Sequence, residues 1–188
     1  GMYSVMIGVL IDNKPAYGWV YQPTADVLYV AAPWQPVRKI TADKSLELPH
    51  VCLSLPRSNI RLMMGNRDRE KHNWVGTIPG VEFVYSGSVG LRVAMIIEGA
   101  ADVYAHLSAK LKVWDTAAPA AMALSAGLEV GSFDFDGVQY VDSQTIHDYA
   151  IAFGRPGTLA WMRDNLRAAR PAETPVIAAA PTSSFLPL

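Results

Sequence analysis

Three strand-like runs open the sequence, and the turns between them are so short that the chain must fold back on itself. Residues 3–11, 16–21 and 27–31 are rich in Val, Ile, Leu and Tyr, whereas Asp, Asn and Pro occupy the turns. Such turns join antiparallel strands, because a parallel pair needs a crossover of a dozen residues or more. The sequence therefore predicts an antiparallel meander, and its mostly apolar strands should be covered on at least one face.

The middle of the chain mixes strand and helix signals. Polar, Pro-containing residues 33–49 predict a surface loop or excursion, and the charged run at residues 67–72 predicts a short surface helix. Residues 89–97 are mostly apolar and fit a buried helix or a buried strand, and periodicity alone does not choose between them. Further strands are predicted at residues 60–64, 81–85, 138–141 and 150–153.

Two helices are predicted in the C-terminal part. The first covers residues 115–126, begins at the capping residues Asp115 and Thr116, and stops at Gly127. The second is an amphipathic helix at residues 158–169. This order of strands and helices predicts a single layered α/β or α+β domain over residues 1–169. Residues 170–188 are rich in Pro and Ala and predict an extended or disordered tail.

Composition narrows the classes of function. Hydrophobic residues make up 51% of the 188 residues and charged residues 18%, as in a globular protein with a sizeable core. The net charge of −1 gives no reason to expect a nucleic-acid polymer or an anionic membrane as a partner. No apolar run reaches the roughly 20 residues that cross a bilayer, and no signal-like segment is present. We therefore predict a soluble, cytoplasmic protein.

Several side chains that often carry chemistry are interpreted as structural. Cys52 lies in an apolar run and is predicted to be a buried, inert thiol, and Trp114 is predicted to lie in the core. The histidines lack the spacing of metal ligands, so each is predicted to be a surface or hydrogen-bonded residue: His50, His72, His106 and His147. A glycine pattern at residues 87–90 lacks the third glycine of a dinucleotide-binding loop.

Asp115 has two compatible interpretations. An Asp before Thr-Ala-Ala is typical of a helix N-cap, which adds about 1 kcal/mol to helix stability. A carboxylate at a helix N-terminus is also well placed to ligate a hard divalent cation beside a bound phosphate. Composition alone favours the cap. The surrounding motif bears on whether Asp115 also ligates a metal.

That motif, Trp-Asp-Thr-Ala-Ala at residues 114–118, closely resembles the Trp-Asp signature of the inositol monophosphatase superfamily. Upstream, Gly-Ser-Val-Gly-Leu-Arg at residues 87–92 and Glu-Gly-Ala-Ala-Asp-Val-Tyr at residues 98–104 also resemble that family's patterns. Residues 3–29 resemble its strand, turn, strand passage, so the likeness covers most of residues 1–140. The variant Lys-Val-Trp-Asp-Thr-Ala-Ala-Pro looks most like the bisphosphate nucleotidase branch, which acts on 3′-phosphoadenosine 5′-phosphate.

The resemblance implies a layered α/β sugar-phosphatase fold and Mg²⁺-dependent hydrolysis of a phosphomonoester, in which metal ions polarise the phosphate and activate a water. It implies that Asp115 ligates a metal. Arg92 stands where the nucleotidase branch often has a substrate-contacting Lys. His106 lies near a sugar-recognising Glu of inositol-specific members, so a nucleotide bisphosphate is favoured over inositol phosphate. The implied substrate contacts are Gly87, Ser88, Val89, Arg92, His106 and Asp115.

The sequence also departs from the family pattern. It contains neither the family's Asp-Pro-Ile/Leu-Asp-Gly-Thr motif nor its Glu-Glu metal ligand, and no Asp-x-x-Asp replaces them. We therefore expect the C-terminal two-thirds of the fold, without its N-terminal portion, and almost no activity, because one carboxylate does not hold Mg²⁺ tightly. Gly1 is either a tag remnant before a start codon at Met2 or a native residue of a longer enzyme.

A non-catalytic remnant that acts as a binding or interaction module is the alternative function. It would keep the Gly87–Ser88 turn and the helix at Asp115, which should face each other, as an anion site. The family's N-terminal helices would normally cover the first sheet. We therefore expect an exposed apolar face there and a homodimer formed through it.

Overall fold

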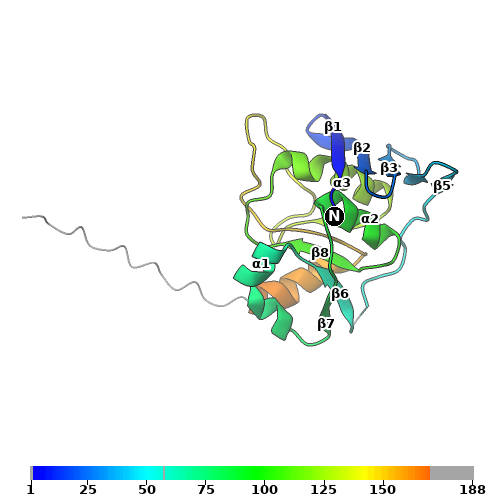
Figure 1. The fold of residues 1–188 in the computed structure, drawn as a ribbon. Coiled ribbons are helices and arrows are strands. Elements are labelled where there is room, and N and C mark those ends of the chain that lie inside the picture. The colour runs from blue at the N-terminus through cyan, green and yellow to red at the C-terminus, as the bar shows by residue number, and fades with distance from the viewer. Residues whose placement is uncertain (1, 57, 170–188) are drawn as a thin grey trace, which may run out of the picture.

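Two five-stranded sheets and two layers of helices make up the structure, a computed structural model that describes residues 2–56 and 58–169 (Figure 1). The first sheet contains β1 (Val5–Ile11), β2 (Lys14–Gln22), β3 (Val27–Ala31), β4 (Arg38–Ile40) and β5 (Ser45–Glu47). The second contains β6 (Ile60–Met63), β7 (Val81–Phe83), β8 (Val103–His106), β9 (Glu129–Gly131) and β10 (Ile151–Gly154). The helices are α1 (Asn66–Lys71), η1 (Asn73–Thr77), α2 (Val89–Ile97), α3 (Val113–Ser125), α4 (Thr158–Trp161) and η2 (Met162–Arg167).

The first sheet confirms the predicted meander and extends it. Its order is β1-β2-β3-β4-β5, and every neighbouring pair is antiparallel. The loop predicted at residues 33–49 is wrong, because β4 and β5 lie within it. These three-residue strands form because β3 presents a free row of backbone groups, which β4 pairs with and β5 then continues.

The second sheet has the order β7-β6-β8-β10-β9. Strand β6 runs parallel to β7 and β8, whereas β10 is antiparallel to β8 and β9. The strands predicted near residues 60, 81 and 150 are confirmed within one or two residues. The strand predicted at residues 138–141 is wrong. There the chain leaves the sheet after Gly137, whose φ is +85°, and the Tyr140 hydroxyl bonds to Thr116 on α3 instead.

Helices α2 and α3 form the layer between the two sheets. Residues 89–97 are thus a buried helix, which settles the choice that periodicity left open. The core on this side of the second sheet includes Met63, Tyr104 and Phe153. The opposite face of that sheet packs against η1 and η2 through a separate cluster that includes Leu62 and Met162.

Helix α3 differs at its start from the prediction. It begins at Val113 with Lys112 as N-cap, so Asp115 lies inside the first turn and its interpretation as the cap is wrong. The helix ends as predicted, because Gly127 adopts φ +76° and Leu128 N donates to Ala123 O at 2.9 Å.

Residues 158–169 are helical as predicted, with a π-helical middle, and the predicted tail at residues 170–188 lies outside the described residues.

Small residues set the distance between the first sheet and α3. A Cβ on Gly18 would lie 2.5 Å from Ala118 O, and one on Gly8 would lie 2.5 Å from Ala117 Cβ. Two glycines on adjacent strands therefore let the sheet approach the helix backbone directly.

Within residues 2–56 and 58–169, no helix has the length and apolar character needed to cross a membrane.

Candidate functional site

The two family-like motifs begin the two central helices. The Gly87–Ser88 turn leads into α2, and Asp115 lies in the first turn of α3. Helices α2 and α3 pack against each other, so the motifs belong to adjacent elements. We predicted that Asp115 faces the Gly87–Ser88 turn, and this direct contact stays a prediction.

The N-terminal segment lies across the Gly87–Ser88 turn. Ser88 N donates to Met2 O at 3.0 Å, and the Ser88 hydroxyl is 2.6 Å from that of Ser4. A Cβ on Gly87 would overlap Met2 O, so this turn needs glycine for close approach. The two Ser88 groups expected to contact substrate therefore already have protein partners.

Asp115 is a half-buried carboxylate beside an imidazole. Partial burial raises the pKa of the Asp115 carboxyl, and a backbone hydrogen bond and the nearby charges of His106 and Lys112 oppose that shift. Burial lowers the pKa of His106 more than the Asp68 carboxylate raises it. Both side chains thus lie in a partly desolvated environment that favours their neutral forms.

Arg92 and His106 line one recess of about 350 Å³ at the start of α2. The Arg92 Nε donates to Ser86 Oγ at 2.9 Å, and its guanidinium lies 4.7 Å from the centre of the Tyr104 ring. These contacts hold the cation in one place while leaving other N–H groups to face the recess. His106 Nε2 is buried and has no hydrogen-bond partner among the described residues, whereas its Nδ1 lies 4.0 Å from an Asp68 carboxylate oxygen.

Asp68 is a site neighbour that sequence reasoning missed. The helix predicted at residues 67–72 is present as α1, but Asp68 is buried instead of solvated. Its carboxylate accepts hydrogen bonds from Leu107 N at 2.8 Å and from Ser108 Oγ at 2.5 Å. It also lies 4.0 Å from His106 Nδ1. Asp68 therefore ties α1 to the end of β8, the strand that carries His106.

A hydrogen-bond network whose partners the sequence did not reveal contacts the first turn of α3. His147 Nε2 is 2.8 Å from Thr116 Oγ1, and its Nδ1 is 3.1 Å from the Tyr149 hydroxyl. The Tyr140 hydroxyl also donates to Thr116 Oγ1, at 3.1 Å. His147 is fully buried, and this network confirms its prediction as a hydrogen-bonded residue. The network anchors residues 139–149 to the turn that contains Asp115.

Two predictions about individual side chains are wrong. Cys52 is exposed, because residues 51–56 form an extended surface segment, and its Sγ lies 3.6 Å from His50 Nδ1. Trp114 is 57% exposed, because the start of α3 turns this position outward, where Lys112 Nζ lies 5.7 Å from the centre of its ring.

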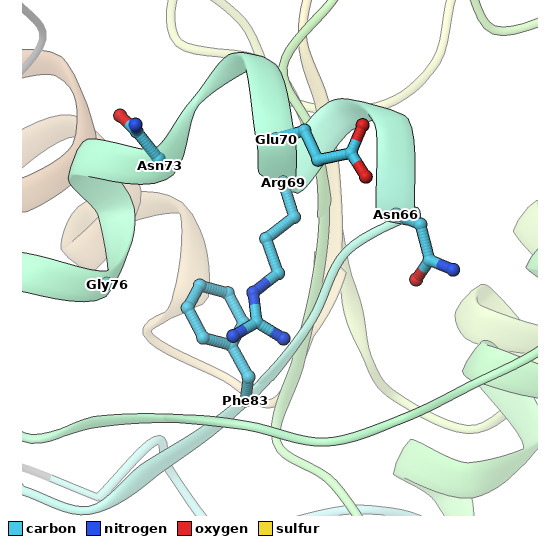
Figure 2. Close-up of a pocket in the computed structure, with 6 residues that line it drawn as sticks. All are labelled: Asn66, Arg69, Glu70, Asn73, Gly76 and Phe83. Carbon is cyan, nitrogen blue, oxygen red and sulfur yellow. The ribbon is translucent and has the colours of Figure 1, made fainter.

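A second recess lies away from the motif residues. Figure 2 shows it between α1, η1 and β7, with the Arg69 guanidinium stacked 4.0 Å from the centre of the Phe83 ring. Its other lining residues are Asn66, Glu70, Asn73 and Gly76. None of the positions implied to contact substrate lines this recess, so Arg69 is a matched control for Arg92.

The residues present do not fit a magnesium site. In the part of the chain that the structure describes, no three His, Cys, Asp or Glu side chains gather closely enough to hold a metal ion. The charged neighbours of Asp115 are His106 and Lys112, and Lys112 is a cation itself. Mg²⁺ requires near-octahedral oxygen coordination. Asp115 and these two neighbours do not supply that coordination.

The fold and motifs define the class of protein, and comparison with known proteins agrees. The model of the Inositol monophosphatase family matches residues 1–160, and the chain therefore belongs to that family. Members of this family are generally Mg²⁺-dependent. The layered arrangement of two sheets and helices is the inositol monophosphatase-like fold.

The chain is similar to 3′(2′),5′-bisphosphate nucleotidases named CysQ. It is 26% identical over 153 residues to that of Shigella flexneri and 27% identical over 153 residues to that of Salmonella typhimurium. Each match covers 77% of this chain and 57% of the relative, so the chain spans little more than half the length of these relatives.

Solved structures show the same fold. CysQ from Bacteroides thetaiotaomicron is 24% identical, with a TM-score of 0.65, and the match covers 81% of this chain and 62% of that one. SuhB of Mycobacterium tuberculosis is 25% identical, also with a TM-score of 0.65, over 89% of this chain and 63% of that one. Inositol monophosphatase from Anabaena is 21% identical, with a TM-score of 0.68 and coverage of 89% and 67%.

Proposed function

We propose that this chain is part of a phosphatase that hydrolyses a small phosphomonoester, with a 3′-phosphoadenosine 5′-phosphate-like nucleotide favoured over inositol phosphate. The observation that carries the proposal is the recess at the start of α2, where Arg92 and His106 lie together with Asp115 as a charged neighbour. Family membership and the similarity to bisphosphate nucleotidases support the same reaction class. The cytoplasmic location stays a prediction.

The charges of the recess support a nucleotide bisphosphate. Arg92 provides a fixed cation that binds a second phosphate group by charge-assisted hydrogen bonds. His106 supplies a buried Nε2 that has no hydrogen-bond partner among the described residues, whereas a carboxylate at this position would repel that phosphate. The Asp68 carboxylate also lines the recess, but Leu107 N and Ser108 Oγ donate hydrogen bonds to it. Both features favour a ligand with two phosphates over one with a single phosphate and many hydroxyls.

We expect Arg92→Ala to raise the dissociation constant for 3′-phosphoadenosine 5′-phosphate about tenfold or more, because a charge-assisted contact is lost. Isothermal titration calorimetry measures this constant directly. Arg69→Ala is the matched control, since Arg69 also stacks on an aromatic ring but lines the other recess. Equal losses in the two variants, or no binding by the original chain, would contradict the nucleotide assignment.

This chain on its own should turn over almost no substrate. Titration with Mg²⁺ is expected to give only weak binding, with a dissociation constant of about 1 mM or higher, because no three possible ligand side chains gather among the described residues and the Asp68 carboxylate already accepts two hydrogen bonds. Asp115→Ala should change that constant little. Tight Mg²⁺ binding that disappears in Asp115→Ala would overturn the inactivity.

A non-catalytic binding module is the second candidate function. It is favoured by the absence of a metal-holding cluster among residues 2–56 and 58–169, since the Arg92 recess could bind an anion without turnover. The coding DNA upstream of Met2 separates the candidates. An in-frame Asp-Pro-x-Asp-Gly-Thr supports the enzyme, whereas a stop codon or unrelated sequence supports the module.

A further inference from the structure

The recess at the start of α2 is lined by a second arginine, Arg67, in addition to Arg92. Arg67 lies in the first turn of α1 and is exposed, whereas Arg92 lies on α2 and is partly buried. The charged run that contains Arg67 was predicted only as a surface helix, and none of the family-like motifs includes it. Arg67 is therefore a cation of the recess that still lacks a role.

The helical repeat of α1 separates Arg67 from its neighbours. Each residue turns the helix by about 100°, so adjacent side chains point to different sides. Asp68 points inward and is 4% exposed. Arg69 lies about 200° around the helix from Arg67 and stacks on Phe83 in the other recess (Figure 2). Arg67 and Arg69 are thus two exposed arginines of one helix, each beside a different recess.

Positive charge predominates in the recess that Arg67 lines. Its one lining acid, Asp68, already accepts hydrogen bonds from Leu107 N and Ser108 Oγ. Within residues 2–56 and 58–169, Arg67 has no ion pair with an acid. Clefts lined by one sign of charge concentrate ions of the opposite sign. The two guanidinium groups therefore repel each other when the recess is empty and attract an anion into it.

The turn before α1 keeps the two cations near each other. A Cβ on Gly65 would lie 3.8 Å from both Nη1 and Nη2 of Arg92. The Arg92 guanidinium therefore lies against the residue two positions before Arg67. The recess measures about 350 Å³, which is at the lower end of the range for ligand pockets. A small anionic group in a recess of this size is within reach of both side chains.

We propose that Arg67 and Arg92 bind the same phosphate group of the ligand from two sides. A phosphate monoester offers three acceptor oxygens and close to two negative charges, so it can accept hydrogen bonds from two guanidinium groups at once. A carboxylate has two oxygens, and one guanidinium fork already fills them. The inference rests on the proposed function, because it adds Arg67 to the same recess as a residue that selects ligands with a second phosphate.

Inorganic phosphate tests the shared contact without the rest of the nucleotide. In a titration at mildly alkaline pH followed by ³¹P NMR, Arg67→Ala should raise the dissociation constant for phosphate about fivefold or more, because one of two charge-assisted contacts is lost. The matched control is Arg69→Ala, since Arg69 is also exposed and lies on the same helix but lines the other recess. It should bind phosphate as the original chain does.

Two further measurements separate binding from folding. Arg67→Lys keeps the charge without the planar fork, so its phosphate affinity should lie between those of the original chain and Arg67→Ala. Without ligand, the midpoint of urea denaturation should not fall in Arg67→Ala, because this change removes a repulsion and no ion pair. A lower midpoint together with an unchanged phosphate affinity would assign Arg67 a structural role and overturn the proposal.

The outcomes also distinguish this inference from the nucleotide assignment. An original chain that binds no phosphate, or equal losses in Arg67→Ala and Arg69→Ala, overturns the shared contact. If 3′-phosphoadenosine 5′-phosphate binds and Arg67→Ala leaves its dissociation constant unchanged, the inference fails and the proposed function stands. If inorganic phosphate binds through Arg67 and the nucleotide does not bind, the nucleotide assignment fails and the shared phosphate contact stands.

Discussion

Gly18→Ala is expected to lower the free energy of unfolding by about 3 kcal/mol, at the upper end of what overpacking costs. The added Cβ would lie 2.5 Å from Ala118 O and 3.1 Å from Ala118 C, so it meets helix backbone instead of a mobile side chain. The first sheet and α3 would have to separate, and the core between them would lose contacts. Urea denaturation followed by circular dichroism measures the change.

Gly65→Ala is the control for Gly18→Ala. The nearest atoms to a Cβ on Gly65 are the Arg92 guanidinium nitrogens at 3.8 Å, and its φ of −67° suits any residue. Its effect should stay within about 0.5 kcal/mol. Similar losses in both variants would mean that the close approach of sheet and helix is not what makes Gly18 necessary.

Asp102→Ala should cost about 3 kcal/mol at neutral pH, because it leaves two guanidinium groups without their buried partner. Asp102 is 1% exposed and accepts hydrogen bonds from Arg61 N, Nε and Nη2, at 2.9, 2.9 and 2.7 Å. Arg155 Nε lies 3.1 Å from the same carboxylate. The three side chains join β6, the start of β8 and the residue after β10.

The contribution of Asp102 should depend on pH. Burial raises the pKa of the Asp102 carboxyl, but hydrogen bonds and charges from Arg61 and Arg155 outweigh it, so the folded-state pKa is lowered. A lowered pKa gives stability that is present above the unfolded value of about 3.9 and is lost as the pH falls through the folded value. Urea denaturation of the original chain and Asp102→Ala should therefore differ most at neutral pH and converge in strong acid.

Asp136→Ala is the matched control for Asp102→Ala. Asp136 also pairs with an arginine, Arg163, at 2.7 Å, but its side chain is 78% exposed. An exposed pair of this kind contributes about 0.5 kcal/mol or less. A difference between the original chain and Asp102→Ala that persists in strong acid would show that the carboxylate charge is not the cause.

Local sequence patterns predicted the elements that have local causes. The apolar runs and short turns of residues 3–31 predicted the meander, and Gly127 predicted the end of α3. Strands β4 and β5 were missed, because three residues carry too little pattern and their pairing depends on the free edge of β3. Residues 138–141 have a strand-like composition, but Gly137 and the Tyr140 contact with α3 direct them elsewhere.

In the candidate site, too, some residues could be predicted from the sequence and others could not. The resemblance to the inositol monophosphatase family singled out Arg92 and His106, and the structure brings them to one recess. The burial of Asp68 and the partners of His147 were missed because the contacts are distant in sequence: Asp68 and Leu107 are 39 residues apart, and Thr116 and His147 are 31 apart. A charged run such as residues 67–72 is typical of a solvated surface, and no local signal distinguishes its one buried acid.

The position of α3 between two sheets also limits how the molecule can open. Residues 116–123 of this helix are all buried, so no side of its central turns faces water. The helix cannot detach or fray along that stretch unless one of the sheets moves away first. Opening of α3 is therefore coupled to unfolding of the whole domain, whereas the short strands β4 and β5 at the sheet border can open locally. The partly exposed turn that contains Asp115 leads directly into this slowly opening stretch.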